Sequence, residues 1–145
     1  MRTKEFLSKL DHDQIVAAIK EAESKTSGEI RVYIQRGALA VDPLVAAEKK
    51  FQELGMDKTD AHNAVLIFVA PRARKFAVVG DKAIHEKCGE GFWQNVVAKM
   101  RGHFQREKFS DALAEAIADA GEALRTHFPR QAMDQDELSD DIVEG

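Results

Sequence analysis

Hydrophobic residues follow two kinds of spacing along the chain, one typical of strands and one typical of helices, and each spacing predicts the elements. Ile30, Val32 and Ile34 alternate with more polar neighbours, which is typical of a strand with one buried face. Residues 64–70, AVLIFVA, are apolar without alternation, which predicts a central strand covered on both faces. Residues 75–81 predict a third strand, antiparallel to the second because only the short turn PRAR joins them.

Apolar residues three and four positions apart predict the helices. Five helical segments are expected, over residues 11–24, 42–55, 83–88, 91–105 and 110–129. The candidates for their N-caps are Asp11 or Asp13, Asp42 and Ser110. A short polar side chain at such a position can accept the first free N–H groups of a helix. Gly55 and Pro129 are expected to end two of these helices.

The order of these elements indicates the fold class. A strand, a helix and a second strand imply a parallel pair with a right-handed crossover, and the third strand then returns antiparallel. We therefore expect an α/β fold, a three-layer αβα sandwich with a small mixed sheet. Residues 1–130 fit one domain, whereas residues 131–145 hold six acidic residues, no basic one and few apolar ones. We expect this last segment to be an acidic, disordered tail.

Charge and composition narrow the classes of partner. The net charge of −4 belongs to the tail, because residues 1–130 contain 21 basic and 19 acidic residues. The sequence has no basic stripe interleaved with aromatic residues, so we do not expect a nucleic-acid partner. Cys88 is the single cysteine and cannot form an internal disulfide, which favours a reducing compartment. The sequence has no apolar run long enough for an export signal or a membrane span. We expect a cytoplasmic protein without membrane insertion.

Polar residues gather in two loops that the topology places together. The two parallel strands begin at one end of the sheet, and the antiparallel third strand ends there, so the loops 55–63 and 80–86 should lie side by side. They supply most of the oxygen-bearing residues at this end: Asp57, Thr59, Asp60, Asn63, Asp81 and Glu86, with Glu29 nearby. Facing carboxylates repel each other unless they are protonated, paired or bridged by a cation. The alternative is a solvated acidic rim partly neutralised by lysines 58, 82 and 87.

This arrangement predicts a divalent-cation site. Hard cations such as Ca²⁺ or Mg²⁺ prefer oxygen ligands from carboxylates, amides and hydroxyl groups. We expect Asp81 and Glu86 to be the principal carboxylate ligands, with Asp60 or Glu29 as a further one. Asn63 or Thr59 would add a neutral oxygen. The ion would order both loops and make their surface a cation-dependent binding face for a protein partner.

Other chemistry has weaker support in the sequence. His85 and Cys88 could share a helix face, but no second Cys/His pair completes a zinc site. A Cys88 nucleophile near the following helix start is conceivable, and a buried structural cysteine is the alternative. The turn residues Arg72, Arg74 and Lys75 form a basic tip at the opposite end of the sheet. This tip could bind an anion or a partner's carboxylates, or it could be a solvated turn.

Three stretches resemble the TPM domain, a family that includes thylakoid lumen proteins of photosystem II repair and many bacterial proteins. They are TSGEIRVYI (26–34), LGMDKTDAHNAVLIFVAPRARKFAVVGD (54–81) and IHEKCGEGFW (84–93). The resemblance extends from about residue 5 to residue 130 and implies a four-stranded sheet, with the fourth strand near 37–41 or elsewhere. It also implies acidic divalent-metal sites in some members and an acid phosphatase activity proposed for the thylakoid branch.

Three functional hypotheses follow from the sequence. The first is a regulatory or protein-interaction domain whose loops a divalent cation, Ca²⁺ or Mg²⁺, orders. The second is a metal-assisted acid phosphatase, a phosphomonoesterase in which His85 or Lys82 assists the phosphate or the leaving group. The third is an interaction module without a metal, whose partner takes the acidic tail or the basic tip. We expect no export signal or membrane anchor in this chain. Together with the family resemblance, this predicts a stand-alone cytoplasmic member of the family.

Overall fold

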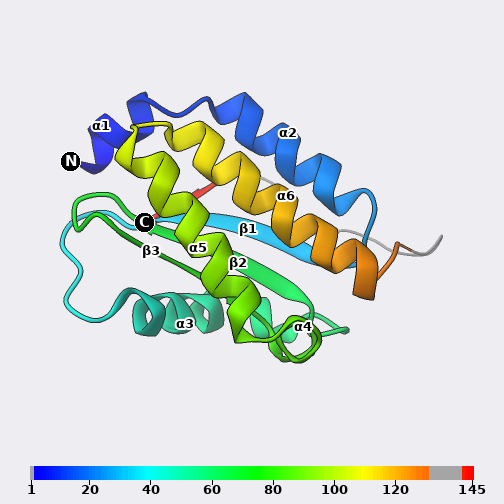
Figure 1. The fold of residues 1–145 in the computed structure, drawn as a ribbon. Coiled ribbons are helices and arrows are strands. Elements are labelled where there is room, and N and C mark those ends of the chain that lie inside the picture. Colours follow the sequence, from blue (N-terminus) through cyan, green and yellow to red (C-terminus); the bar gives the residue numbers. More distant parts are fainter. Residues whose placement is uncertain (1, 131–141) are drawn as a thin grey trace.

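The computed structural model describes residues 2–130 and 142–145, and Figure 1 shows its elements. The helices are α1 (Thr3–Ser8), α2 (His12–Glu23), α3 (Pro43–Glu53), the short 3-10 helix η1 (Met56–Lys58), α4 (Lys82–Cys88), α5 (Glu90–Gln105) and α6 (Phe109–His127). The strands are β1 (Glu29–Ile34), β2 (Ala64–Ala70), β3 (Lys75–Gly80) and β4 (Val143–Glu144). The five expected helices and three expected strands are confirmed to within about two residues. The sequence pattern missed α1, which is too short to show a helical period.

The strands form one mixed sheet in the order β3-β2-β1-β4. β1 and β2 are parallel, with Glu29 opposite Ala64, and β2 and β3 are antiparallel, with Val65 opposite Gly80. The α/β fold class and the four-stranded mixed sheet are therefore confirmed. β4 pairs in parallel with the end of β1. The suggestion of a strand near 37–41 was wrong, because this segment turns away from the sheet at Gly37, where φ is +77°.

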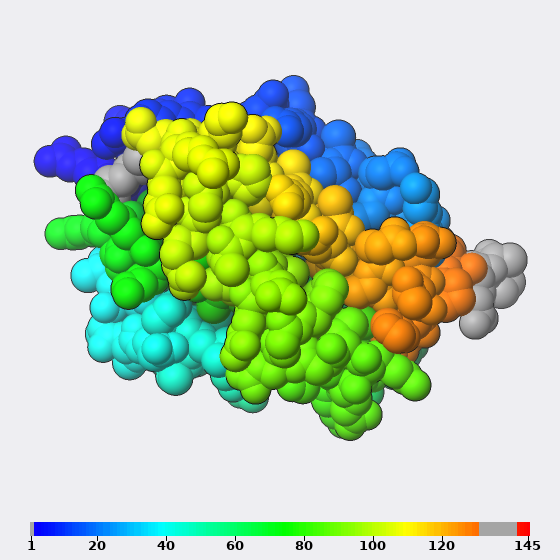
Figure 2. Space-filling view, viewed as in Figure 1, coloured from blue at the N-terminus to red at the C-terminus, as the bar shows by residue number. Residues whose placement is uncertain are grey.

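Two hydrophobic clusters lie on the two faces of the sheet. Figure 1 shows the layers of helices on either side of the sheet. Side chains from α2, α5 and α6 pack with Ile30, Val32 and Ile34 on one face. On the other face, α3 packs against β2 and β3. The space-filling view shows α5 and α6 side by side on the first face, with the green turn between β2 and β3 at the same end as the N-terminus (Figure 2). The β2 strand is buried along its whole length, as expected for a central strand.

The second face of β1 differs from the expectation. Tyr33 is only 4% exposed, so β1 is covered on both faces at this position and the prediction of one buried face was wrong there. The Tyr33 ring is stacked with that of Phe68 at a centroid distance of 5.7 Å, and Lys50 Nζ lies 4.8 Å from its centre. A tyrosine side chain is amphipathic, so at a polar position of the alternation it can be either buried or exposed to solvent. Only the placement of α3 decides that Tyr33 is buried.

Two of the expected N-caps are confirmed and one was wrong. Asp11 Oδ1 accepts a hydrogen bond from Gln14 N at 3.1 Å, and Asp42 Oδ1 accepts one from Leu44 N at 2.9 Å. Ser110 lies inside α6, and its Oγ accepts a hydrogen bond from the backbone N–H of Asp11 at 2.8 Å. Ser110 thus connects the start of α2 to α6, which a local capping pattern cannot reveal.

The end of the chain also departs from the expected acidic tail. Residues 131–141 lie outside the described residues, but Val143–Glu144 form β4 beside β1. Arg36 N donates a hydrogen bond to Gly145 O at 2.7 Å, and Arg36 Nη2 lies 3.2 Å from Glu144 Oε2.

Within the described part of the chain, no helix combines the length and apolar character needed to cross a bilayer.

Candidate functional site

The two polar loops meet at one end of the sheet, which we call the acidic end: residues 55–63, residues 80–86 and the start of β1. Glu29 opens β1 opposite Ala64, the first residue of β2. Asp81 N donates a hydrogen bond to Ala64 O at 2.9 Å, and Ala83 N donates one to His62 O at 3.1 Å. The predicted neighbourhood of the two loops is therefore confirmed, and backbone hydrogen bonds connect them directly.

Asp81 is the central carboxylate of the acidic end. It is the N-cap of α4, and its Oδ1 accepts a hydrogen bond from Lys82 N at 2.8 Å. Its side chain is only 11% exposed, and its Oδ2 lies 3.4 Å from His62 Nδ1. One carboxylate oxygen is therefore used by the helix start, while the other faces an imidazole.

His62 is a residue that the sequence reasoning left unassigned. Its backbone has a φ of +51°, one of three non-glycine residues with positive φ in the described chain. A positive φ costs conformational energy in a residue with a side chain, and residues in such conformations cluster at functional sites. No sequence signal reveals this pair, because the proximity of His62 to Asp81 depends on the hydrogen bonds between the two loops.

Three of the predicted site residues are buried: Glu29, Thr59 and Asn63. Asn63 Nδ2 lies within hydrogen-bonding distance of Ser27 Oγ, at 3.2 Å, which fixes the amide beside the start of β1. Thr59 Oγ1 is a buried oxygen without a hydrogen bond to another described residue, and so are Asp57 Oδ1 and Asp81 Oδ2. Burying polar oxygens without a donor is unfavourable, so ordered water or a cation is needed to compensate.

The other two predicted ligands lie differently. Asp60 is exposed on the loop before β2, and Glu86 is exposed on α4. Among the described residues, no group of three or more His, Cys, Asp or Glu side chains is arranged to hold a metal ion. A hard cation at this end would therefore have few carboxylate ligands. Neutral oxygens, such as those of Thr59 and Asn63, would have to supply the others.

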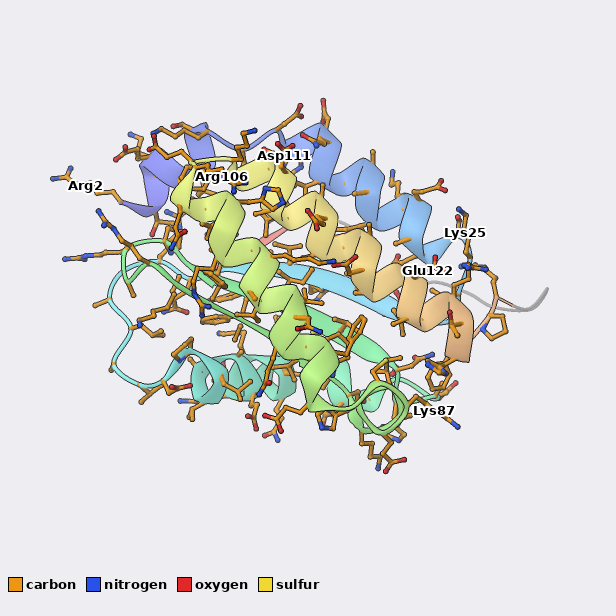
Figure 3. The ribbon with its side chains drawn as sticks, viewed as in Figure 1. Arg2, Lys25, Lys87, Arg106, Asp111 and Glu122 are labelled. Atoms are coloured by element: carbon orange, nitrogen blue, oxygen red, sulfur yellow. The ribbon has the colours of Figure 1, made fainter. Side chains whose placement is uncertain are left out.

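The lysines around this end do not neutralise it through direct pairs. Lys58, Lys82 and Lys87 are exposed, and none of them forms an ion pair with a carboxylate in residues 2–130 or 142–145. Figure 3 shows Lys87 at the outer edge of the molecule near α4, away from the sheet. The proposed neutralisation of the rim by these lysines is thus limited to screening through solvent.

Another buried carboxylate, that of Glu23, was missed by the sequence prediction. It is 2% exposed at the end of α2, and its Oε2 accepts a hydrogen bond from the Ile30 backbone N–H at 2.7 Å. The signal was present in the sequence, because Glu23 follows Ile15 and Ile19 at intervals of four on the same helix face. An acidic residue on a buried stripe requires a specific donor, and here that donor is the second residue of β1.

The thiol chemistry considered for Cys88 has little support. Cys88 is half-buried at the end of α4, and burial raises the pKa of its thiol above the ordinary value. A raised pKa lowers the thiolate fraction, whereas a nucleophilic cysteine needs it increased. Trp93 packs in the core against the sheet, with 5% of its surface exposed.

Comparisons with known proteins concern the family and the fold of this chain. A family model described as the TPM domain matches residues 1–123. Among solved structures, the NMR structure of the BA42 protein from the psychrophilic bacterium Bizionia argentinensis is similar, with 36% sequence identity and a TM-score of 0.83. The alignment covers 94% of this chain and 95% of that chain. No match is found among curated proteins.

Proposed function

This chain belongs to the TPM domain family, and on that premise we propose that it binds a divalent cation, Ca²⁺ or Mg²⁺, at the acidic end. The supporting observation is the set of buried oxygens on Asp57, Thr59 and Asp81 that have no hydrogen-bond partner among the described residues. Carboxylate, hydroxyl and amide oxygens are the ligands that both ions prefer, and they disfavour softer metals.

Asp81 would be the principal carboxylate ligand. Its Oδ2 is buried, and a positive charge next to that oxygen would offset the cost of its burial. Glu29, Thr59 and Asn63 lie at the same end of the sheet, whereas Asp60 and Glu86 are exposed and would turn inward to complete the set. The cation would hold the two loops together and make their outer surface depend on its concentration.

The biological role that follows is regulatory. A loop surface ordered by a cation can bind a protein partner only when the cation is present, which is how many Ca²⁺-dependent modules act. We place this role in the cytoplasm, a proposal that depends on the single cysteine and its inability to form an internal disulfide.

Calorimetric titration with Ca²⁺ and with Mg²⁺ tests the proposal, with thermal melting in chelator as a second readout. Saturable heat and a rise in melting temperature with added cation are expected, because a ligand that binds the native state stabilises it. Asp81→Asn should weaken binding about tenfold or more, since it removes a charge while asparagine still caps α4. Asp42→Asn is the matched control, because Asp42 is also an N-cap whose carboxylate accepts a backbone hydrogen bond, but it caps α3 at the other end of the sheet.

Two results would remove this function. One is heat indistinguishable from dilution together with an unchanged melting temperature in millimolar cation. The other is equal binding by Asp81→Asn and the unsubstituted protein, which would place the ion elsewhere.

A second candidate function, a metal-assisted phosphomonoesterase, is favoured by the His62–Asp81 pair. The Asp81 carboxylate lies 3.4 Å from an imidazole nitrogen of His62, and this electrostatic contact can orient the ring of a general acid or base. A bound divalent cation would neutralise the charge of the phosphate. His62 replaces His85 in the role that the sequence suggested, because His85 is exposed on α4.

Turnover of p-nitrophenyl phosphate with and without added cation tests this activity. His62→Asn should abolish turnover without lowering the melting temperature, because asparagine tolerates a positive φ better than most residues. His85→Asn is the control and should keep the activity. Absence of turnover by the unsubstituted protein with either cation would exclude the phosphatase and leave the cation proposal standing.

A further inference from the structure

The end of the sheet opposite the acidic end contains an open cavity of about 720 Å³. The turn between β2 and β3 forms one wall, the last turns of α5 form another, and the start of α3 closes a third side. Its size is within the range of small-molecule sites in proteins. Neither the cation proposal nor the phosphatase proposal uses any residue that lines it.

The floor of the cavity is aromatic. Phe76 and Phe104 lie edge to face with ring centroids 4.8 Å apart, and Phe104 contacts Phe109 at 5.6 Å. Phe6 completes the group, 5.0 Å from Phe109. Phe6 and Phe109 are buried, whereas Phe76 and Phe104 are only half-buried and present ring surface to the cavity. A ring or an aliphatic chain could therefore pack there.

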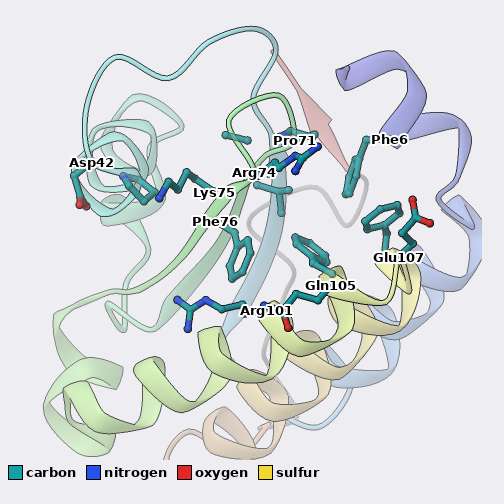
Figure 4. A pocket seen from close by; sticks show the side chains of 14 residues that line it. Phe6, Asp42, Pro71, Arg74, Lys75, Phe76, Arg101, Gln105 and Glu107 are labelled. Atoms are coloured by element: carbon teal, nitrogen blue, oxygen red, sulfur yellow. The ribbon is translucent and has the colours of Figure 1, made fainter. Parts of the chain in front are cut away.

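Three cations stand around this floor: Arg74, Lys75 and Arg101. Figure 4 shows Lys75 and Arg101 extending on either side of Phe76. Within the described part of the chain, none of the three forms an ion pair or a side-chain hydrogen bond. Their charges are thus available to a ligand.

The two acidic residues of the cavity are already engaged. Asp42 Oδ1 accepts a hydrogen bond from Leu44 N, and Glu107 Oε1 lies 3.5 Å from Lys9 Nζ. The lining carries three cations against these two carboxylates, so its net charge is positive. Arginine guanidinium groups bind carboxylate and phosphate oxygens in a bidentate geometry, which suits an anionic group held above the rings.

The backbone adds an independent observation. Arg74 and Glu107, both in the lining, have φ values of +54° and +58°, and they are two of the three non-glycine residues with positive φ in the described chain. Glycine would be the relaxed choice at such a turn position. An arginine kept there despite this cost holds its guanidinium at the edge of the cavity, and residues in such conformations cluster at ligand sites.

We propose that this cavity binds a small amphiphilic organic anion. Its apolar or aromatic part lies on Phe76 and Phe104, and its carboxylate or phosphate group lies between Arg74, Lys75 and Arg101. Both parts contribute, so an anion without an apolar part and an apolar molecule without charge bind more weakly. The two proposed sites lie at opposite ends of the sheet, so each can fail without the other.

Amide chemical-shift titrations of the full chain test this proposal with four probes. The first two are 4-phenylbutyrate and benzylphosphonate, which carry a carboxylate and a phosphonate that a phosphatase cannot hydrolyse. The others are inorganic phosphate and the uncharged 4-phenylbutan-1-ol. At least one aromatic anion should shift the amides of residues 74–78 and 101–109, and the stronger of the two identifies the acid group. The other two probes should bind at least about fivefold more weakly.

Three variants separate the charge from the fold. Arg101→Gln should raise the Kd of the better anion about fivefold or more, because it removes a guanidinium from an exposed helix position. Arg106→Gln is the matched control, since Arg106 lies at the end of α5 without lining the cavity (Figure 3). Arg74→Gly should also weaken binding, yet melt no lower than the unsubstituted protein, because glycine favours a φ of +54°.

Several results would overturn the proposal. The first is no shift at residues 74–78 and 101–109 with either aromatic anion at millimolar concentration. The second is equal binding of the uncharged alcohol, which would leave the three cations without a role. The third is equal weakening by Arg101→Gln and Arg106→Gln, which would indicate diffuse attraction to a positive surface. Shifts confined to the acidic end would place the anion there instead.

Discussion

Replacing Gly80 with alanine is expected to destabilise the protein through a contact with Trp93. A Cβ atom at position 80 would lie 2.5 Å from Cζ2 and 3.0 Å from Cε2 of the Trp93 ring, and 3.1 Å from Ile84 Cγ2. Such distances are shorter than the contact distance of two carbon atoms, so the ring or the strand must move. Trp93 is only 5% exposed and is held by the core, so it has little room to yield.

The size of the effect follows from two opposing contributions. Forcing an extra carbon into a packed core costs about 1–3 kcal/mol in the free energy of unfolding. Alanine also restricts the unfolded chain, which returns about 0.4–1 kcal/mol where φ is negative, as it is at Gly80. We expect a net loss of about 1–2 kcal/mol, which corresponds to a decrease in melting temperature of roughly 3–8 °C for a chain of this size.

Thermal denaturation followed by circular dichroism measures this change, and Gly102→Ala is the matched control. Gly102 lies within α5, the helix that carries Trp93, and a Cβ there meets no atom within 4 Å. That substitution should stabilise the protein by about 0.5–1 kcal/mol through helix propensity. The near-UV signal of Trp93, the single tryptophan, should change in Gly80→Ala and stay unchanged in the control.

The reasoning would be refuted if Gly80→Ala melted at or above the temperature of the unsubstituted protein. A lower melting temperature with an unchanged near-UV signal would also contradict it, because the loss would then come from a contact other than the tryptophan ring.

Three further predictions concern other parts of the molecule. Alkylation of Cys88 by iodoacetamide should accelerate only at higher pH than for a cysteine in an unstructured peptide, because burial raises its pKa; a midpoint at or below that of the peptide would contradict this. Leu113→Ala should cost about 3–5 kcal/mol by urea denaturation, since Leu113 is fully buried in α6, and a loss under about 1 kcal/mol would be inconsistent with its packing. Deleting residues 142–145 should speed the hydrogen exchange of the Arg36 amide about tenfold or more, because its acceptor is Gly145 O; an unchanged rate would argue against β4.

The periodic elements were predictable from local patterns. A characteristic hydrophobic spacing marks most of the longer elements: the strands β1, β2 and β3 and the helices α2, α3, α5 and α6. Each spacing places the apolar side chains on the faces that the element buries. The shared end of the sheet also followed from chain direction, because a parallel pair and an antiparallel return leave few alternatives. Chain direction therefore predicts that Asp81 lies near Asn63 and Glu29.

Contacts between distant segments were not predictable in the same way. His62 faces Asp81 because two loops exchange backbone hydrogen bonds, and Ser110 serves the start of α2 across 99 residues. Neither contact has a local sequence signal. The short strand β4 was missed for the same reason, since a strand of two residues has no period and exists only because β1 offers a free edge.

The sequence by itself determined the strands β1 to β3, the helices α2 to α6 and the end of the sheet at which the acidic loops lie. Hydrophobic period is a local property, and chain direction follows from the order of the elements. Only the tertiary structure decided which polar atoms of those loops are buried, whether Tyr33 faces a helix or water, and that Phe76 and Phe104 form a floor beneath Arg74 and Arg101. Burial depends on what packs against a residue from elsewhere in the chain. A charge or a ring at one position therefore acquires its chemical role only when segments far apart in the sequence come together.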